Sequence, residues 1–264
     1  MTDALDEREI RAQLEALVGR SWAPAIVVEP LTGSTNDDVK ALARSGAAPG
    51  ALVVAEAQTA GRGRSGAAWH SPAGENLYIS LLLRPELAPA AIVPFTLVVG
   101  SVVRDVAQRR LAAPVSIKWP NDVLCRKKKL AGVLVEGQVR GESLGSIVVG
   151  VGVNVHARAF PPPLDSIATS LAIEGAEPSA LSRNALAADL VAGVYGAADR
   201  FVAEGFAGFL GSIRAHDALR GRPVSVNGVT GVATEIDASG ALVVERADGS
   251  RVEITSGHVE ILPP

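Results

Sequence analysis

The stretch TAGRGRSGAAWH (residues 59–70) contains GRGRSG at 61–66, which has the G-x-G-x-x-G spacing of a dinucleotide-binding loop. Such a loop follows a strand and opens a helix, whose amino terminus holds the pyrophosphate. The strand is present as ALVVAEA (51–57), but Pro72 and Gly74 interrupt a helix after the glycines. A Rossmann fold is therefore disfavoured. Two interpretations remain: a flexible surface loop, or a loop that wraps an anion neutralised by Arg62 and Arg64.

The sequence around this loop predicts a chain of mixed α and β structure. Apolar residues at helical spacing, or in short continuous runs, distinguish the expected helices from the expected strands. We expect helices over residues 5–20, 33–46, 92–110 and 179–214. We expect strands over residues 25–31, 51–57, 76–83, 115–119, 122–125, 130–139 and 146–155, and a loop over 160–166.

The pattern changes at about residue 217. Beyond it, short alternating strands are separated by Asn-Gly, Ala-Ser-Gly and Asp-Gly turns. Such spacing predicts a small antiparallel barrel or sandwich of about five strands. We therefore expect two domains, residues 1–216 and 217–264.

Composition excludes several classes of protein. The chain has 264 residues, of which 48% are hydrophobic, and a net charge of −3, so no global positive field attracts nucleic acid or an anionic membrane. Its single cysteine, Cys125, excludes an internal disulfide and a C-x-x-C metal pair. The acidic start MTDALDEREIR has no signal-peptide pattern, and no apolar run reaches about 18 residues. We expect a soluble, cytoplasmic protein that does not span a membrane.

A second polar cluster, KWPND at 118–122, lies between two expected strands. Asn121 and Asp122 are suited to a nucleotide or to hydrated Mg²⁺. Lys129 leads directly into the apolar run LAGVLVE, where a phosphate could meet it. The preceding residues 126–128 are expected to form a solvated basic hairpin tip.

Two further short motifs have both a structural and a functional interpretation. In GSTN (33–36), a helix cap accounts for one hydroxyl and leaves the other hydroxyl and Asn36 without a role. In GVGVNV (150–155), Gly150 and Gly152 lie on the same face of a strand. They either relieve packing or form a flat floor for a ligand, because glycine in a strand often marks a close approach.

Taken in order, these motifs resemble those of the bacterial biotin protein ligases. The matching segments are GSTN (33–36), QTAGRGRSGAAW (58–69), KWPND (118–122), KLAG (129–132) and GVGVN (150–154), with ENLYIS and ATSL as further similarities. The resemblance covers residues 25–175 strongly. It implies an α+β fold: a mixed sheet packed with helices, like the class II aminoacyl-tRNA synthetases, plus a small C-terminal SH3-like β-barrel.

The resemblance also implies a function. Biotin protein ligases join the biotin carboxylate to the α-phosphate of ATP, release pyrophosphate, and transfer biotin to one lysine of a biotin carboxyl carrier domain. Lys129 and Arg64 would be catalytic, because fixed cations stabilise charge at the phosphoryl centre. The implied biotin site contains Ser34, Thr35, Asn36, Gln58, Gly61, Arg62, Gly63, Arg64, Lys129, Gly132, Leu134, Gly150 and Gly152. The implied ATP site contains Arg64, Trp69, Asn121, Lys129 and Asn154. Mg²⁺ is expected with ATP, and no protein metal ligands are assigned.

The sequence departs from the family in two places. Only about 24 residues precede the first expected strand, which are too few for the DNA-binding domain of many relatives, so we expect no DNA binding. Ala67 stands where some relatives have a third arginine. No histidine is assigned a catalytic role, and a homodimer is allowed by the resemblance. Two alternatives stay open: a lipoate or octanoate ligase of related fold, and a non-enzymatic biotin sensor.

Overall fold

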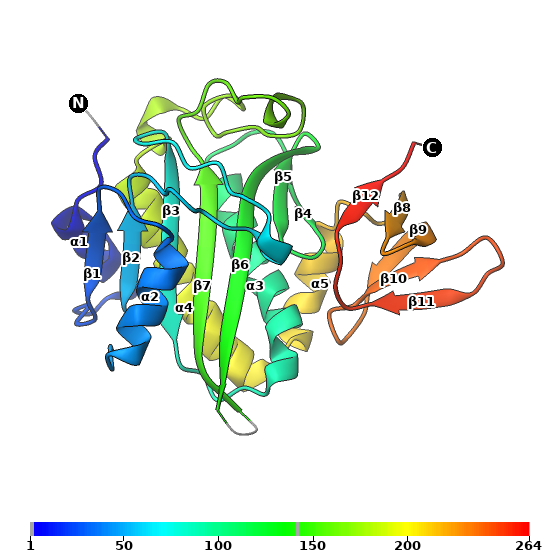
Figure 1. The fold of residues 1–264 in the computed structure, drawn as a ribbon, viewed down its shortest axis with the longest axis horizontal. Coiled ribbons are helices and arrows are strands. Elements are labelled where there is room, and N and C mark those ends of the chain that lie inside the picture. The colour runs from blue at the N-terminus through cyan, green and yellow to red at the C-terminus, as the bar shows by residue number, and fades with distance from the viewer. Residues whose placement is uncertain (1–2, 141–142, 264) are drawn as a thin grey trace.

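The computed structural model describes residues 3–140 and 143–263, and it contains two sheets (Figure 1). The larger sheet has the strand order β1-β2-β3-β7-β6-β5-β4, in which β1 and β2 are parallel and the other neighbours are antiparallel. Its strands are β1 Ile26–Glu29, β2 Leu52–Ala55, β3 Asn76–Leu83, β4 Val115–Lys118, β5 Asp122–Cys125, β6 Lys128–Arg140 and β7 Ser143–Asn154. The predicted α+β class with a mixed sheet is confirmed.

Helices cover the two faces of this sheet unequally. The helices are α1 Glu7–Val18, α2 Thr35–Arg44, α3 Ile92–Gln108, α4 Arg183–Glu204 and α5 Ala207–Ala215. Helices α3 and α4 pack behind the sheet, while α2 lies on the opposite face against β2, β3 and β7 (Figure 1). Strand β7 shows both environments, because Val149 and Val151 join the main core whereas Val148 packs beneath α2. The part of the front face beyond α2 is where the polar motifs gather.

Helix α3 is apolar for a structural reason. The segment Pro89–Gln108 is long and apolar enough to cross a membrane, so the expectation that no segment reaches that length was wrong. Within the fold, however, Phe95, Leu97, Val98 and Val99 are fully buried in the main core, and α3 contacts β4, β6 and α4. The helix is therefore apolar because it lies in the centre of the core.

Several boundaries differ from those expected. The predicted helix over 179–214 is two helices, because α4 ends at Gly205, which has a φ of 69° that favours glycine. The predicted loop over 160–166 includes a short 3₁₀ turn, Leu164–Ser166. In α1, Leu17 is 53% exposed, whereas Ile10 and Leu14, which share its helical spacing, are buried.

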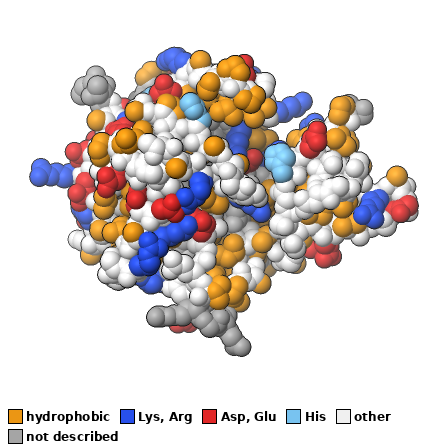
Figure 2. Space-filling model, in the orientation of Figure 1, with side chains coloured by type: hydrophobic (Ala, Val, Ile, Leu, Met, Phe, Trp, Pro, Cys, Tyr) orange, Lys and Arg blue, Asp and Glu red, His pale blue; other side chains and the backbone are white. Residues whose placement is uncertain are grey.

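The C-terminal sheet is antiparallel and five-stranded, as predicted. Its order is β11-β10-β9-β8-β12, with β8 Pro223–Val226, β9 Val229–Ile236, β10 Leu242–Glu245, β11 Arg251–Ile254 and β12 Val259–Ile261. Trp119 anchors it to the larger sheet, since its buried indole Nε1 donates to the Gly240 carbonyl at 2.9 Å. Ile117 also exchanges backbone hydrogen bonds with His216 and Ala218. A hollow lies between the larger body and this sheet, with Lys and Arg side chains and a histidine around it (Figure 2).

Candidate functional site

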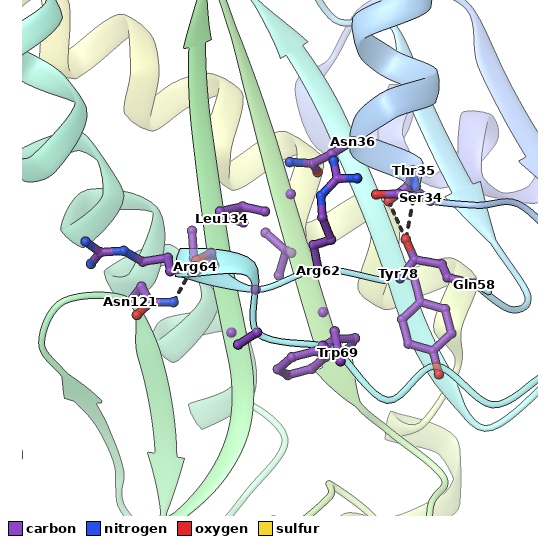
Figure 3. A pocket seen from close by; sticks show the side chains of 18 of the residues that line it. Ser34, Thr35, Asn36, Gln58, Arg62, Arg64, Trp69, Tyr78, Asn121 and Leu134 are labelled. Atoms are coloured by element: carbon purple, nitrogen blue, oxygen red, sulfur yellow. Dashed lines mark hydrogen bonds between the residues drawn. The ribbon is translucent and has the colours of Figure 1, made fainter. Parts of the chain in front are cut away.

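The floor of the candidate site follows from the strand register. One row of cross-strand partners runs over four strands: Tyr78 on β3, Gly152 on β7, Gly132 on β6 and Asp122 on β5. A second row lies two residues further along the strands and consists of Ser80 on β3, Gly150 on β7 and Leu134 on β6. Since side chains alternate between faces with a period of two, both rows face the same side, toward α2 and the glycine loop. A cavity lies above these rows (Figure 3).

The glycines in these rows leave space that other side chains of the protein occupy. A Cβ on Gly152 would lie 2.5 Å from Cε2 of Trp69, and one on Gly132 would lie 2.9 Å from Cζ3 of the same ring. A Cβ on Gly150 would collide with the Asn36 amide. The close approach expected at these glycines is present, but it is made by Trp69 and Asn36, which themselves line the cavity.

A chain of hydrogen bonds connects α2 to the end of the glycine loop. Thr35 Oγ1 lies 2.7 Å from Ser80 Oγ, and the backbone N of Thr35 donates to Gln58 Oε1 at 3.0 Å. Gln58 Nε2 donates to Ser71 Oγ at 3.0 Å, and Ser71 donates to the Trp69 carbonyl at 3.0 Å. Each polar group in this chain therefore has a fixed orientation. Ser34 occupies the N-cap position of α2 but makes no side-chain capping bond, so capping does not explain the buried serine.

Asn36 is oriented by two residues that the sequence analysis did not identify. Its Nδ2 donates to Glu136 Oε2 at 2.7 Å, while its Oδ1 accepts from Ser80 at 2.6 Å. The other oxygen of Glu136 pairs with Lys40 Nζ at 2.7 Å. A charged residue inside the apolar run LAGVLVE was the available signal for Glu136. Asn36 thus presents a defined amide at one end of the cavity.

The glycine loop closes on itself over the cavity. Gly63 N donates to the Ala67 carbonyl at 2.7 Å, and Trp69 N donates to the Gly61 carbonyl at 2.9 Å. Arg62 points to α2, where it forms an ion pair with Asp37. Arg64 extends in the other direction, on the side of the cavity where Asn121 lies (Figure 3). Burial lowers the pKa of Arg64, and the charge of Asp122 acts in the opposite direction.

Lys129 lines the cavity near Asp122 and the ring of Trp69. Its Nζ is 2.7 Å from Asp122 Oδ1 and 5.2 Å from the ring centroid of Trp69. The contact with Asp122 is an ion pair without hydrogen-bond alignment. The Lys129 backbone is held by Ile167 and Thr169, with Asn154 Nδ2 at 3.4 Å from the Lys129 carbonyl oxygen. Lys129 is therefore a positioned cation beside the only carboxylate among the described residues that line the cavity.

Fourteen of the predicted residues line this one cavity: Ser34, Thr35, Asn36, Gln58, Arg62, Gly63, Arg64, Trp69, Asn121, Lys129, Gly132, Leu134, Gly150 and Gly152. Gly61 does not; it lies at the base of the loop, where a Cβ would meet Ser71 Oγ at 2.6 Å. Asn154 lines an adjoining, more apolar hollow together with Trp69 and Lys129.

The structure adds lining residues that the sequence analysis did not assign to the site. Tyr78 reaches the cavity from β3, and burial raises the pKa of its phenol well above the usual range. His258 reaches it from the start of β12, and the sequence had assigned no histidine to the site. Only the three-dimensional pairing of distant segments brings these two residues to the site.

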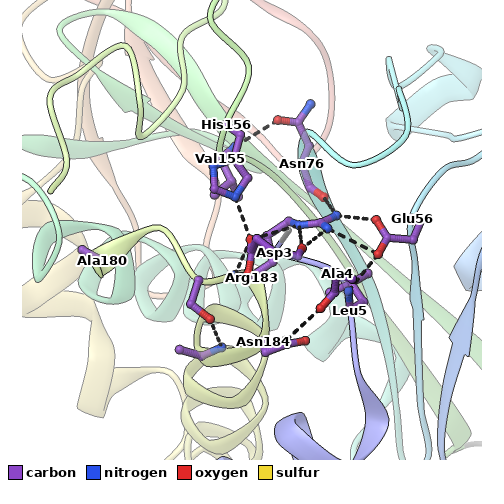
Figure 4. A network of polar contacts seen from close by, with 12 residues as sticks. Asp3, Ala4, Leu5, Glu56, Asn76, Val155, His156, Ala180, Arg183 and Asn184 are labelled. Carbon is purple, nitrogen blue, oxygen red and sulfur yellow. Dashed lines mark hydrogen bonds and ion pairs between the residues drawn. The ribbon is translucent and has the colours of Figure 1, made fainter. Parts of the chain in front are cut away.

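A buried ionic network supports the strand ends next to the cavity. Arg183 is 2% exposed and pairs with Glu56 Oε2 at 2.7 Å and with Asp3 Oδ2 at 3.2 Å (Figure 4). Its guanidinium also donates to the Asn76 carbonyl at 3.2 Å, and His156 lies 2.6 Å from Asp3. Because Glu56 directly follows β2 and lies two residues before Gln58, this network fixes the end of the strand that leads to Gln58.

Comparison with known proteins agrees with this geometry. Residues 28–154 match the model of the biotin/lipoate A/B protein ligase family, and residues 221–262 match the biotin protein ligase C-terminal domain. A biotin–[acetyl-CoA-carboxylase] ligase of Paracoccus denitrificans is 33% identical, over 84% of this chain and 94% of that protein. The bifunctional ligase/repressor BirA of Escherichia coli is 36% identical, over 87% and 72%.

A solved structure supports the same assignment. The biotin protein ligase of Aquifex aeolicus, in complex with biotin and ATP, superposes with a TM-score of 0.76 and 28% identity, covering 91% of this chain and 99% of that one. The C-terminal domain match and the ordered motifs separate this chain from the lipoate ligases of the wider family. The chain therefore belongs to the biotin/lipoate A/B protein ligase family, as one of its biotin protein ligases.

Proposed function

We propose that this protein makes biotinyl-5′-AMP from biotin and ATP and then transfers biotin to a lysine of a biotin carboxyl carrier domain. The observation that carries the proposal is the position of Lys129. It lies beside Asp122 in a cavity that is also lined by the polar side chains of Thr35, Asn36 and Gln58 and by the further cation Arg64. A carboxylate and a phosphate can meet only where a cation offsets their repulsion.

In the first step, a biotin carboxylate oxygen attacks the α-phosphorus of ATP. A new carbon–oxygen–phosphorus linkage forms, the bond from the α-phosphorus to the bridging oxygen breaks, and diphosphate leaves with the bonding electrons. Lys129 and Arg64 would stabilise the charge that develops on the phosphoryl oxygens. In the second step, the carrier lysine amine attacks the acyl carbon, the bond from that carbon to the phosphate oxygen breaks, and AMP leaves with the bonding electrons while the amine loses one proton to solvent.

The orientation of the slot is consistent with biotin binding. Thr35, Asn36 and Gln58 present hydroxyl and amide groups whose directions are set by Ser80, Glu136 and Ser71. Such pre-oriented donors and acceptors suit a cyclic urea. Trp69 would stack on the adenine, with Asn121 and Asn154 on the nucleotide side.

Mg²⁺ would enter with the nucleotide. No group of three or more metal-ligating His, Cys, Asp or Glu residues occurs within residues 3–140 and 143–263. A magnesium ion that is held mainly by nucleotide phosphates needs only one or two carboxylates, and Asp122 fits that requirement. The ion would supply charge neutralisation, while the residues of the chain orient the substrates.

Acid-dependent pyrophosphate exchange tests the proposal. Purified protein is incubated with ATP, Mg²⁺ and labelled pyrophosphate, with biotin, lipoate, octanoate or no acid. We expect exchange with biotin alone, followed by biotin transfer to an added carrier domain. Exchange with lipoate or octanoate instead would identify a ligase for those acids, and biotin binding without exchange would identify a sensor. We further propose a cytoplasmic protein that binds neither DNA nor membranes.

A further inference from the structure

The direction of the Lys129 side chain depends on a β-bulge in β6. Gly132 and Leu134 face the cavity from this strand. Strict alternation would place Leu130 on that face too, and Lys129 behind the sheet. Instead, Leu130 is fully buried in the main core, whereas Lys129 lines the cavity. The pairing of β5 with β6 shifts register at this point, so one extra residue in β6 reverses the alternation and aims Lys129 at the cavity.

The backbone of Lys129 is held by a segment that lies beyond the end of β7. Strand β7 ends at Asn154, and residues 167–169 then form a parallel bridge to Lys129. Lys129 N donates to the Ile167 carbonyl at 2.7 Å, and the Lys129 carbonyl accepts from Thr169 N at 2.9 Å. Asn154 Nδ2 donates to the Thr169 carbonyl at 2.9 Å. Both main-chain polar groups of Lys129 thus depend on the position of residues 167–169.

A buried carboxylate fixes this segment, which contains the start of ATSL (168–171). Thr169 is fully buried, and its Oγ1 donates to Glu174 Oε1 at 2.6 Å. The Glu174 side chain is 6% exposed, and its other oxygen pairs with Arg126 Nε at 3.0 Å. Glu174 N donates to the Ser170 carbonyl at 3.0 Å, so the turn after ATSL brings the carboxylate back to Thr169. A buried carboxylate with a partner on each oxygen makes a rigid support.

Glu174 also contacts the hairpin that carries Lys129. Arg126 and Lys127 join β5 to β6, and both have positive φ values, of 47° and 71°. This is the conformation of a tight two-residue hairpin turn, and Lys129 follows it by two residues. The ion pair with Arg126 therefore connects Glu174 to the turn, while the bond from Thr169 connects it to the 167–169 segment. Lys129 lies between these two supports along the chain of contacts.

We propose that Thr169 and Glu174 are positioning residues for adenylation, because they hold the bulge that aims Lys129 at the reacting carboxylate and α-phosphate. The proposal rests on the adenylation activity proposed above. Neither side chain is among the described residues that line the main cavity, so both act through the backbone of Lys129. Displacing a catalytic group by about 1 Å is enough to cost about a hundredfold in rate. A hydroxyl and a carboxylate outside the cavity therefore influence the chemistry inside it.

A double-mutant cycle separates positioning from general stability. Thr169→Val removes the hydroxyl and keeps the shape of the side chain, whereas Thr169→Ser keeps the hydroxyl. Glu174→Gln keeps an oxygen for Thr169 but removes the charge that pairs with Arg126. Thr96→Val is the matched control, since Thr96 is a buried threonine of α3 whose hydroxyl donates to a carbonyl at 2.7 Å. Each substitution is made in wild type and in Lys129→Ala.

Adenylation is measured with enzyme in excess, together with KM for biotin and for ATP and hydrogen exchange at the Lys129 amide in unliganded protein. We expect Thr169→Val and Glu174→Gln each to lower the adenylation rate by about tenfold or more, with much smaller changes in either KM. Exchange at the Lys129 amide should become faster in both. Thr169→Ser should recover most of the rate, and Thr96→Val should behave as wild type. In the Lys129→Ala background, neither substitution should lower the rate further.

Equal losses of rate in the wild-type and Lys129→Ala backgrounds would overturn the proposal, as would wild-type rates in both variants. If Thr169→Val does not fold, Glu174→Gln and Thr169→Ser decide, because Thr169→Ser keeps the supporting bond and Glu174→Gln keeps the size of the side chain. Failure of the proposed function looks different, since wild-type protein would then make no adenylate. Hydrogen exchange at the Lys129 amide would still test the support, and unchanged exchange in Thr169→Val and Glu174→Gln would overturn it.

Discussion

The guanidinium of Arg62 donates two hydrogen bonds to the carboxylate of Asp37, with both N–O distances at 2.5 Å. The pair joins the glycine loop to the first turn of α2. The hydrogen bonds from Arg62 are the main reason that the pKa of Asp37 lies below its usual value. Because the Asp37 side chain is 52% exposed, solvent screening limits the pair to about 1 kcal/mol or less.

This pair leads to a prediction about loop order. Asp37→Asn should loosen residues 61–63 and increase hydrogen exchange across 61–70 in the unliganded protein by about fivefold or less. Adding biotin and ATP should restore most of the protection. Asp105→Asn, which alters a comparable exposed pair with Arg104, serves as the control. Equal exchange in wild type and Asp37→Asn would show that the pair does not order the loop.

The same pair has a defined pH dependence. The folded-state pKa of Asp37 is lowered, so its contribution is complete above the ordinary aspartate pKa and disappears as the pH falls through the lowered value. Loop exchange in wild type should therefore approach that of Asp37→Asn only in strongly acidic solution.

Lys129→Ala should nearly abolish adenylation. Lys129 is the cation that lies 2.7 Å from Asp122 in the main cavity, and its loss would leave a carboxylate facing two further anions. Loss of such a preorganised cation costs about 3 kcal/mol or more in the transition state, which is a rate loss above a hundredfold. Biotin-dependent pyrophosphate release is the assay, with Lys128→Ala as the neighbouring control. Activity within tenfold of wild type would exclude the proposed role.

The elements of the fold were predictable from the sequence because each has a local cause. The strand over 76–83 was predicted at the bounds that β3 has, since NLYISLLL consists mostly of apolar residues, and all eight residues are buried. The break at Gly205 was missed because Ala- and Leu-rich sequence continues on both sides of it.

The site was predictable only in part, since its assembly depends on strand register. Glycine motifs in β6 and β7 indicated close approach, but sequence does not show that Gly132 pairs with Gly152, or that Trp69 covers both. His258 is more than 120 positions from Lys129 and reaches the same cavity because the C-terminal sheet packs against the larger body. No local pattern contains that information.

Ala67→Arg should strengthen ATP binding. Ala67 lines the main cavity and the hollow beside the C-terminal sheet, and it is exposed. An arginine there would therefore have room to reach nucleotide phosphates. A charge-assisted hydrogen bond is worth about 1.5–3 kcal/mol before losses to side-chain ordering and screening, so we expect a gain of about tenfold at most. Biotin affinity should change much less. Calorimetry with each ligand separates the two effects, and unchanged ATP affinity would refute the expectation.

Gly152→Ala should damage the site without greatly destabilising the fold. The added Cβ would lie 2.5 Å from Cε2 of Trp69, so the indole ring must move. Because this ring also faces Lys129, we expect ATP binding and adenylation to fall by about tenfold or more. Gly196→Ala is the matched control, since a Cβ in the middle of α4 meets nothing within 4 Å there. Wild-type ATP affinity in Gly152→Ala would contradict this account of the glycine.

Asp217→Asn should stabilise the protein at neutral pH. Asp217 lies where the chain pairs with β4 before entering the C-terminal sheet, and burial raises the pKa of its carboxyl to about 6 from an ordinary 3.8. The unfolded chain releases this proton at lower pH than the folded chain, so stability falls as the pH rises from about 4 to about 6 and stays reduced above it. Asparagine keeps an oxygen that can accept the 2.9 Å bond from Leu219 N but carries no charge to bury. We expect a gain of about 1–3 kcal/mol in the free energy of unfolding at pH 7 and almost none at pH 4. Urea denaturation at both pH values measures the difference, and a gain that is equal at pH 4 and pH 7 would show that carboxylate burial is not its cause.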